Sequence, residues 1–259
     1  MSIENNKDNK VAFLVVSCDA YSDLWEPFFQ CFFKYWPDCP YQIYLSSNFK
    51  KFPDSRVRSI CLGEDSDYST NLIAILRQIE EENLIFWFED VFLAGRVDTQ
   101  RVVSLVNKLS VNDISYLKLS IDYPWVYTTE FVDLIGPIPK GVKYRGAVGM
   151  AYYKKSLLAK MLIPGLSAWQ MDKSDISNTM KESFYALSTQ GLKNPPFKYE
   201  HAVIKGRWSY PTPKFLESEG LGHCIKNRKR QSKKDHLYIQ LFWLRLKLYK
   251  ALKHHWYEK

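Results

Sequence analysis

The amino-acid sequence predicts an α/β fold in which helices flank a mainly parallel central sheet. Two short runs, 11–17 and 84–90, contain continuous apolar stretches rich in β-branched or aromatic residues, as strands buried on both faces do. Between these runs, segments with apolar residues at helical spacing alternate with further strand-like segments. The resulting order, β-α-β-β-α-β, indicates a parallel sheet with helices packed against it.

The first half of the chain supplies most of this predicted sheet. Strands are expected at four ranges: 11–17, 41–47, 57–63 and 84–90. A helix over 22–36 has Ser22 as its expected N-cap, and a second helix over 69–83 has Ser69 in the same role. Both helices repeat apolar residues three and four positions apart, so each has one face that can pack on the sheet.

The second half has a more irregular pattern. A helix is expected over 98–109, where Asp98 is the candidate N-cap, and a strand over 115–121. A turn-rich loop, a short helix, a mixed loop-and-strand segment and a terminal helix follow at 136–146, 154–162, 194–213 and 235–259.

Composition excludes several classes of protein. The chain has 259 residues and is 46% hydrophobic, which is enough for a packed core. It has no run of about 18 apolar residues, so we expect no transmembrane helix. The polar N-terminus lacks an apolar signal region, which favours the cytoplasm. The five cysteines form no CxxC pair, so we expect reduced thiols rather than disulfides or a zinc site.

Carboxylates gather where the predicted strands end. Asp19, Asp65, Glu89 and Asp90 each lie at or just after the carboxyl end of a predicted strand. In open parallel sheets, ligands bind beyond that edge. Carboxylate oxygens also suit Mg²⁺ or Mn²⁺, which keep positions open for substrate phosphates. The alternative is that these acids only begin turns.

Four stretches, in this order, resemble bacterial nucleotide-sugar-dependent glycosyltransferases of the GT-A fold, the type that builds surface polysaccharide or lipopolysaccharide. They are VVSCDAYSDLWEPFFQCFFKYWPDCPYQIYL, GEDSDYSTNLIAILRQI, LIFWFEDVFL and YRGAVGMAYYKKSLLAKMLIPGLSAWQMD. The resemblance implies a single GT-A-like, Rossmann-type domain over 1–225, with a donor half at about 10–110 and an acceptor half at about 111–225. A basic linker and an amphipathic helix would follow over 226–259.

The resemblance implies a donor site at the sheet edge. Nine residues would bind the nucleotide: Ser17, Cys18, Asp19, Tyr21, Asp65, Ser69, Asn71, Glu89 and Asp90. Asp90 matches the acid that the family uses toward a metal and the diphosphate, so Mg or Mn is the expected cofactor there. The motif is Glu89-Asp90-Val91 rather than a full DxD, so a metal-independent transferase stays open. Lys205 and Arg207 would then offset the charge of the diphosphate.

The resemblance also implies an acceptor site in the second half. Asp172 would be the base that removes the proton from the acceptor hydroxyl in an inverting transfer, with Asp175 as the alternative. Trp169 would stack on a sugar face, and Arg145 and Gly146 would shape the acceptor loop. Without the resemblance, Trp169 is an ordinary aromatic residue and Asp172 a helix cap.

The predicted C-terminal helix has one stripe of leucines, and a basic segment, residues 226–236, leads into it. The stripe consists of Leu237, Leu241, Leu244, Leu248 and Leu252. Largely away from it lie Lys247, Lys250, Lys253 and His254. This pattern fits an interfacial helix on anionic lipid, which would place the protein at the inner face of the plasma membrane. It fits equally an amphipathic helix docked on the protein's own core.

We therefore expect a cytoplasmic glycosyltransferase that moves a sugar from a nucleotide-diphosphate sugar to a glycan or lipid-linked acceptor, such as lipopolysaccharide or capsule. One alternative is a non-catalytic nucleotide- or carbohydrate-binding protein of the same fold. A second is a nucleic-acid-binding protein, because the formal net charge is +8. That alternative is the weakest, since no recognisable nucleic-acid module accompanies the basic run.

Overall fold

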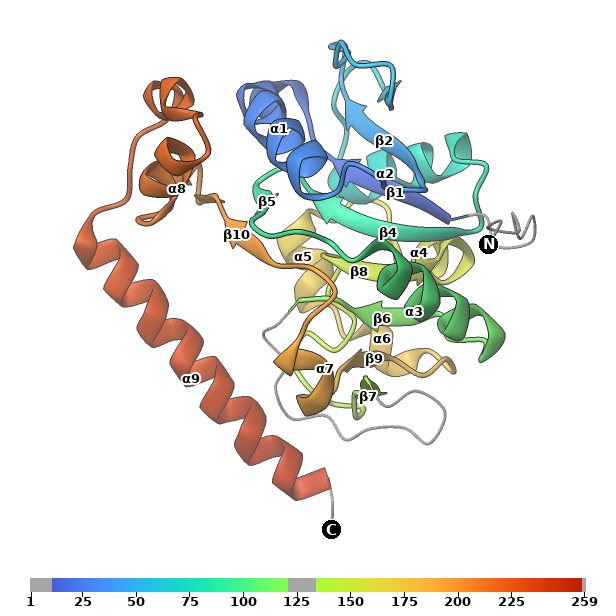
Figure 1. Cartoon of the computed structure of the whole chain (residues 1–259). Coiled ribbons are helices and arrows are strands. Elements are labelled where there is room, and N and C mark those ends of the chain that lie inside the picture. The colour runs from blue at the N-terminus through green and yellow to red at the C-terminus, as the bar shows by residue number, and fades with distance from the viewer. Residues whose placement is uncertain (1–10, 121–133, 258–259) are drawn as a thin grey trace.

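The computed structural model describes residues 11–120 and 134–257, which form an α/β fold around a large central sheet (Figure 1). The strands are β1 (Val11–Val16), β2 (Gln42–Ser47), β3 (Val57–Cys61), β4 (Asn83–Phe88), β5 (Val91–Leu93), β6 (Tyr116–Lys118), β7 (Ile135–Pro137), β8 (Ala151–Lys154), β9 (Tyr185–Leu187), β10 (Tyr199–His201), β11 (Val203–Ile204) and β12 (Arg207–Trp208). The α-helices are α1 (Trp25–Tyr35), α2 (Tyr68–Gln78), α3 (Thr99–Val111), α4 (Lys155–Met161), α5 (Ala168–Lys173), α6 (Ile176–Thr179), α7 (Thr189–Lys193), α8 (Thr212–Ser218) and α9 (Lys233–Tyr257). Two 3-10 helices are η1 (Asp19–Leu24) and η2 (Gly222–Asn227).

The central sheet has eight strands in the order β3-β2-β1-β4-β8-β6-β9-β7. The first four are parallel to one another, as the sequence predicts. β8 enters antiparallel between β4 and β6, and β9 then runs parallel to β6. Periodicity does not predict β8, because it is only four residues long and runs directly into α4. The last residue of the predicted strand 115–121 lies outside the described residues.

Side chains alternate between two cores on the two faces of the sheet. In β1, Phe13 and Val15 belong to one core, and Ala12 and Leu14 belong to the other. α1 and α3 cover the first face, whereas α2 and α4 cover the second. Because both faces are covered, the central strands are apolar throughout, which explains the continuous runs in the sequence.

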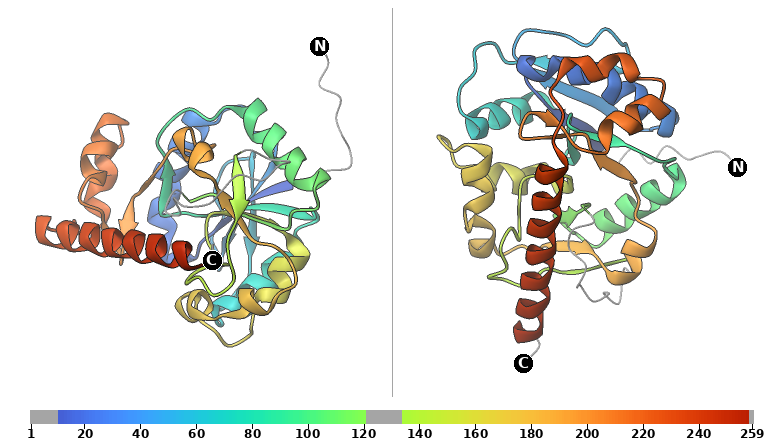
Figure 2. Two further views of the ribbon diagram at one scale, coloured as in Figure 1. Left: turned by 90° about the horizontal axis from the view of Figure 1, so that it is seen from below. Right: turned by 90° about the vertical axis from the view of Figure 1, so that its left-hand side faces the viewer.

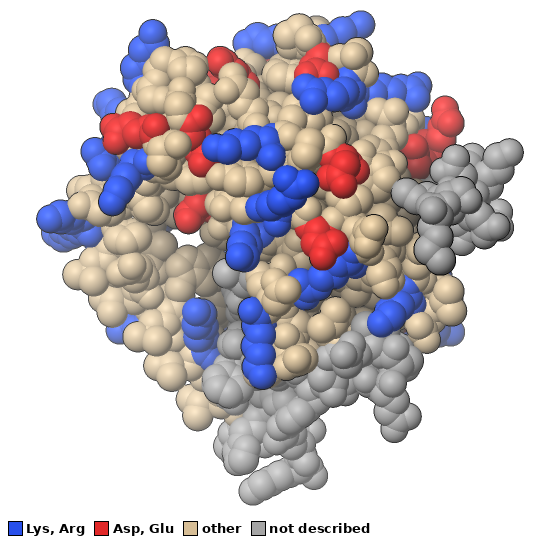
Figure 3. Space-filling model, viewed as in Figure 1, with Lys and Arg blue, Asp and Glu red and all other residues tan. Residues whose placement is uncertain are grey.

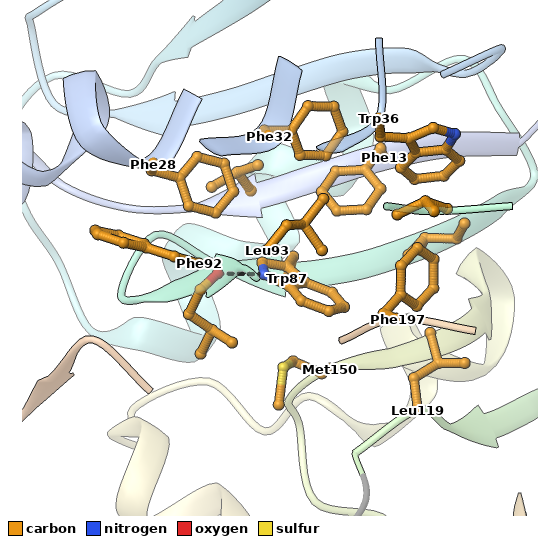
Figure 4. Packing of buried hydrophobic residues seen from close by; sticks show 14 of the residues in the cluster. Phe13, Phe28, Phe32, Trp36, Trp87, Phe92, Leu93, Leu119, Met150 and Phe197 are labelled. Atoms are coloured by element: carbon orange, nitrogen blue, oxygen red, sulfur yellow. Dashed lines mark hydrogen bonds between the residues drawn. The ribbon is translucent and has the colours of Figure 1, made fainter. Parts of the chain in front are cut away.

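Aromatic rings fill the first core (Figure 4). Phe13 lies at the centre, with its ring centroid 4.9 Å from that of Phe32, 5.8 Å from that of Trp36 and 5.7 Å from that of Trp87. Phe197 approaches the ring of Trp36 at 5.4 Å and that of Trp87 at 5.3 Å. Phe197 comes from the second half of the chain, so this core joins the two halves. The edge-to-face pairs among them, such as Phe13 with Phe32, each add about 0.5–1.5 kcal/mol to the free energy of burial.

Two of the three expected N-caps are wrong. Asp67, not Ser69, caps α2 by accepting a hydrogen bond from Thr70 N, at 2.9 Å. A 3-10 helix precedes α1, so Ser22 lies upstream of the α-helix and its hydroxyl accepts from Lys50 Nζ instead. Asp98 caps α3, which confirms the third expectation.

The C-terminal helix α9 runs away from the sheet along one side of the molecule (Figures 1 and 2). In the space-filling view, the lower left edge over α9 is mostly tan with blue patches (Figure 3). Among the described residues, no helix is both long enough and apolar enough to cross a membrane.

Candidate functional site

The loop after β1 meets the loop after β2 at the carboxyl edge of the sheet. Asp19 accepts backbone N–H bonds from Asn48, Phe49 and Lys50, at 3.1 to 3.3 Å. Its own backbone N–H donates to Asn48 Oδ1 at 2.9 Å. The carboxylate of Asp19 therefore holds the second loop in place, which positions whatever this edge of the sheet binds.

Glu89 and Asp90 form the turn between β4 and β5, and several bonds fix that turn. Trp87 Nε1 donates to Val91 O across the turn at 2.7 Å, the dashed line in Figure 4. β5 pairs antiparallel with β10, and Asp90 O accepts from Ala202 N at 2.8 Å. The buried aromatic strand thus holds two adjacent carboxylates rigidly at the sheet edge.

Glu89 is buried and Asp90 is partly buried, which makes their ionised forms costly. Burial, together with the neighbouring charge of Asp90, raises the pKa of Glu89 to about 8. Burial likewise raises the pKa of Asp90 to about 6. The positive charge of Arg228 acts in the opposite direction on both groups. Two adjacent acids with raised pKa values at the sheet edge are candidates for a ligand site.

Asp172 adds a third, partly buried acid from the second half of the chain. It lies in α5 and accepts a hydrogen bond from Val148 N at 3.0 Å. Burial raises the pKa of Asp172 to about 6, while that backbone bond and the charge of Lys118 lower it. Lys118 is buried at the end of β6 and was not singled out in the sequence.

Tyr68, in the first turn of α2, lies near two of these acids, Asp172 and Glu89. Its buried hydroxyl has no hydrogen-bond partner among the described residues. Burial raises the pKa of Tyr68, and the charges of Asp172 and Glu89 raise it further. A buried hydroxyl without a partner costs about 1–3 kcal/mol, so this one is suited to a ligand's polar atom. Sequence reasoning missed Tyr68, because an aromatic residue at a helix start gives no functional signal.

The remaining predicted nucleotide residues differ in their surroundings, and Ser69 differs most from the others. Asn71 Nδ2 donates to Asp65 Oδ1 at 2.6 Å. Burial raises the pKa of the Cys18 thiol, and the charges of Glu89 and Asp65 add to the increase. Ser17 Oγ accepts from Trp25 Nε1 at 2.7 Å. We call Cys18, Asp65, Tyr68, Glu89, Asp90 and Asp172 the acidic cluster. Ser69 differs from the rest, because it is fully buried and its hydroxyl donates to Leu166 O.

A pocket of about 690 Å³ with a basic lining opens beside Asp19. Lys205 and Gly206 form its hairpin turn between β11 and β12, with φ values of 51° and 74°. Two positive φ angles are typical of the tight type I′ hairpin turn, where glycine brings the backbone close to a ligand. The pocket is lined by Asp19, Ala20, Ser22, Asp23, Lys50, Lys205, Gly206, Arg207, Asn227, Arg228 and Lys229. The predicted diphosphate residues Lys205 and Arg207 therefore meet Asp19 here, whereas Glu89, Asp90 and Asp172 do not line this pocket.

Arg228 links the basic pocket to the acidic cluster. Its guanidinium donates to both carboxylate oxygens of Asp23, at 2.7 and 2.6 Å, and lies 4.4 Å from the centroid of the Tyr21 ring. Its charge also acts on Glu89 and Asp90. The sequence placed Arg228 in the basic linker, because its partner Asp23 is 205 positions away.

Two of the predicted acceptor residues serve packing. Arg145 is buried and donates to the backbone carbonyls of Ile138 and Ser177. A side chain on Gly146 would place its Cβ only 2.6 Å from Ser177 Cβ. Both residues fix the conformation of this loop, and its role as an acceptor loop stays a prediction. Trp169 is different, because it is 71% exposed on α5, three residues before Asp172.

The acids partly fit a divalent cation. Among the described residues, one group of potential metal ligands has its atoms within 4.8 Å of one another: Glu26, His223 and Cys224. That group does not include Asp90. A cation at Asp90 would therefore be held by one or two carboxylates, with substrate oxygens completing its shell, which is the usual arrangement for Mg²⁺.

No protein-family model matches the chain, and no curated protein matches it in sequence. It is similar in structure to S. aureus TarS residues 1–349, with a TM-score of 0.46 and 10% identity over 73% of this chain and 59% of that chain. It is also similar to a CMP:2-keto-3-deoxy-manno-octonic acid synthetase complexed with CTP, with a TM-score of 0.45 and 13% identity over 82% and 98% of the two chains. A cytidylyltransferase from Leptospira borgpetersenii gives a TM-score of 0.44 and 12% identity over 68% and 75%. The chain covers less than two thirds of the TarS fragment.

Proposed function

We propose that this protein is a glycosyltransferase that moves a sugar from a nucleotide-diphosphate sugar to a glycan or lipid-linked acceptor in surface polysaccharide synthesis. One observation carries the proposal. The charges of Glu89 and Asp172 both act on Tyr68, whose hydroxyl has no partner among the described residues, at the carboxyl edge of the sheet, and Asp90 lies next to Glu89. A basic pocket adjoins them through Arg228. Acids beside clustered cations suit a substrate with both hydroxyls and phosphates.

The donor would lie across these two regions. The diphosphate suits the basic pocket, where Lys205, Arg207 and Lys229 offer cations and Gly206 permits close backbone approach. The sugar would extend toward the acidic cluster, where carboxylates accept hydrogen bonds from sugar hydroxyls. When bound, Mg²⁺ or Mn²⁺ at Asp90 would neutralise diphosphate charge. Arg228 and the pocket lysines can offset part of the diphosphate charge without a metal.

Asp172 is proposed as the base of an inverting transfer. A base works best with a pKa near the working pH, and a value of about 6 leaves Asp172 ionised yet proton-accepting at neutral pH. It would take the proton of the acceptor hydroxyl while that oxygen bonds to the anomeric carbon and the nucleotide diphosphate leaves. Trp169, exposed on the same short helix, offers a ring face for stacking on the acceptor sugar.

A nucleotide screen tests the proposal at the level of binding. The protein is heated with each common nucleotide and nucleotide sugar, with and without Mn²⁺. A ligand at a hundredfold its dissociation constant stabilises the fold by about 2.7 kcal/mol, which raises the melting temperature measurably. If no nucleotide raises the melting temperature, the proposed donor site is wrong.

Substitution tests the chemistry separately. With the donor found in the screen, Asp172→Asn and Asp90→Asn should each lower transfer or donor hydrolysis by at least about a hundredfold. The matched control is Asp113→Asn, which changes an exposed carboxylate at the end of α3. Nucleotide binding without any turnover in the wild type would favour the non-catalytic alternative.

A further inference from the structure

Helix α9 carries an unusual amount of exposed apolar surface. Eight of the twelve exposed large apolar side chains in the described part of the chain lie on it, with exposures from 38% for Trp243 to 69% for Tyr238. The other four are scattered singly over the molecule: Phe49, Val111, Ile163 and Trp169. Scattered apolar residues are normal on protein surfaces, but a contiguous row indicates an interaction site.

The leucine stripe of α9 faces outward. Its members recur every three or four residues and are each more than half exposed: Leu237, Leu241, Leu244, Leu248 and Leu252. The side away from the leucines holds Ile239, Leu246 and Tyr249, which are partly buried, and also Phe242 and Trp243, which are exposed. The ring centroid of Tyr249 lies 5.3 Å from Nζ of Lys143, a residue outside α9. The leucines are therefore not docked on the protein's own core.

Local contacts hold the start of α9 in this orientation. Asp235 accepts hydrogen bonds from Ser232 N and Ser232 Oγ, at 3.0 and 2.8 Å. The ring of His236 stacks on Tyr210 with centroids 5.2 Å apart. The helix thus leaves the body at a defined angle (Figure 2), and each leucine of the stripe is more than half exposed.

Cations border the leucine stripe. Lys233, Lys234, Arg245 and Lys247 are exposed, with Arg245 and Lys247 on either side of the leucines by helical geometry. Asp235 is the one acid in the sequence of α9, and it is engaged at the helix start. The structure does not describe the side chains of Lys250, Lys253 and His254. The border of the stripe is therefore electropositive.

We propose that the leucine face of α9 is a docking surface for an anionic lipid bilayer. The leucines would enter the boundary between headgroups and acyl chains, while Arg245 and Lys247 extend along the apolar surface to reach lipid phosphates. The apolar segment 237–249 is about 20 Å long at 1.5 Å per residue, which is shorter than the roughly 30 Å hydrocarbon layer. The helix therefore lies in the plane of the membrane.

Charge favours lipid over a second copy of the chain. Leu237, Leu241, Leu244 and Leu248 have heptad spacing, so two copies could in principle pair along them. In such a pair, Arg245 and Lys247 would flank the seam with cations on both helices and no acid to match them. Two heptads are also shorter than the three or four that stable coiled coils need. Anionic headgroups complement the same charges.

Vesicle binding by the full-length protein tests this surface. Vesicles of phosphatidylcholine alone are compared with vesicles that also contain phosphatidylglycerol, at low and high salt. Binding is expected to the mixed vesicles and to weaken with salt. Arg245→Gln with Lys247→Gln should lower the partition coefficient by about thirtyfold, since each cation near the surface contributes tenfold or less. Leu244→Ser with Leu248→Ser should lower it at least about tenfold.

Val111→Ser is the matched control, because Val111 is an exposed apolar residue at the end of α3. The vesicle binding of this variant should equal that of the wild type. All substituted residues are exposed, so thermal unfolding should be unchanged and loss of binding cannot be attributed to misfolding. Absence of vesicle binding, or equal binding by the leucine variant, overturns the proposal. A dimer that Leu244→Ser with Leu248→Ser converts to monomer would assign the face to a second copy instead. Transfer activity does not enter this test, so the two proposals fail independently.

Discussion

At the scale of single residues, Asp172 shows how burial can prepare a carboxylate for chemistry at a cost in stability. Its pKa of about 6 exceeds the ordinary value of 3.8. The folded state therefore prefers the protonated form. Protonated Asp172 therefore adds to the free energy of unfolding. This contribution is fully present below the pKa that the group has in the unfolded chain, and it is lost as pH rises through about 6.

Asp172→Asn should remove this cost. Above pH 6 the variant is expected to be more stable than the wild type by about 3 kcal/mol, from roughly 1.4 kcal/mol per unit of pKa shift. Below about pH 4 the difference should vanish, because Asp172 is then protonated. Denaturant unfolding of both proteins at the two pH values measures it. A variant that is less stable at both would contradict the raised pKa.

Trp169 provides a second prediction at this scale, which rests on the proposed function. Trp169→Ala should raise KM for the acceptor up to about tenfold, because one aromatic stacking contact is lost. Stability should change by less than about 0.5 kcal/mol, since the side chain is 71% exposed. Trp169→Phe keeps a ring and should retain most acceptor binding. Steady-state kinetics with varied acceptor check it, and an unchanged KM in the alanine variant would exclude Trp169 from the acceptor site.

At the scale of elements, α4, α6 and the loop before β9 meet at a point with no room for a side chain. A Cβ on Gly146 would lie 2.6 Å from Ser177, 2.7 Å from the Phe184 ring and 3.0 Å from Met161. Gly146 is therefore required by packing, and the loop that it belongs to carries Val148, whose N–H bonds Asp172. Packing of these elements thus controls the position of the proposed base.

Gly146→Ala should lower the free energy of unfolding by about 1–3 kcal/mol, because the neighbouring side chains must move apart. Gly222→Ala is the matched control, since a Cβ there meets only Glu217 Cγ at 3.8 Å. It should change stability little. Thermal and denaturant unfolding compare the two variants. Equal effects at both positions would show that the loop before β8 repacks freely.

At the scale of the whole molecule, the chain returns on itself so that residues far apart in sequence complete one region. Arg228, beyond the sheet in sequence, binds Asp23 from the loop after β1 and lowers the pKa of Glu89 and Asp90. β10 pairs with β5 directly behind the acidic turn. The C-terminal segment is therefore part of the site as well as the start of α9.

Arg228→Gln should destabilise the fold by about 1.5–3 kcal/mol, because it leaves the partly buried Asp23 without its charged partner. It should also raise the pKa of Glu89 and Asp90 further, since their nearest favourable charge is lost. Lys226→Gln, which changes an exposed cation two residues away, is the control. Unfolding free energies and carboxyl titration by NMR provide the measurements. A destabilisation equal to that of Lys226→Gln would contradict the link.

Local signals explain which predictions are confirmed. Continuous apolar runs predict β1 and β4, helical spacing predicts α2 and α3, and the position of Asp98 before a helical pattern predicts the cap of α3. The turn at Glu89 and Asp90 was expected at the strand end. Ser69 failed as a cap, because Asp67 lies closer to the helix start and tertiary packing buries the Ser69 hydroxyl.

The sequence by itself determined the α/β class, the central parallel strands and the acids at their carboxyl ends, because periodicity and turn chemistry are local properties. Only the tertiary structure decided that Asp172 joins Glu89 around Tyr68, that Arg228 reaches Asp23, and that the leucines of α9 face outward. These facts depend on desolvation and on contacts between residues far apart in the chain. Neither desolvation nor long-range contacts can be derived from the spacing of residues along the sequence.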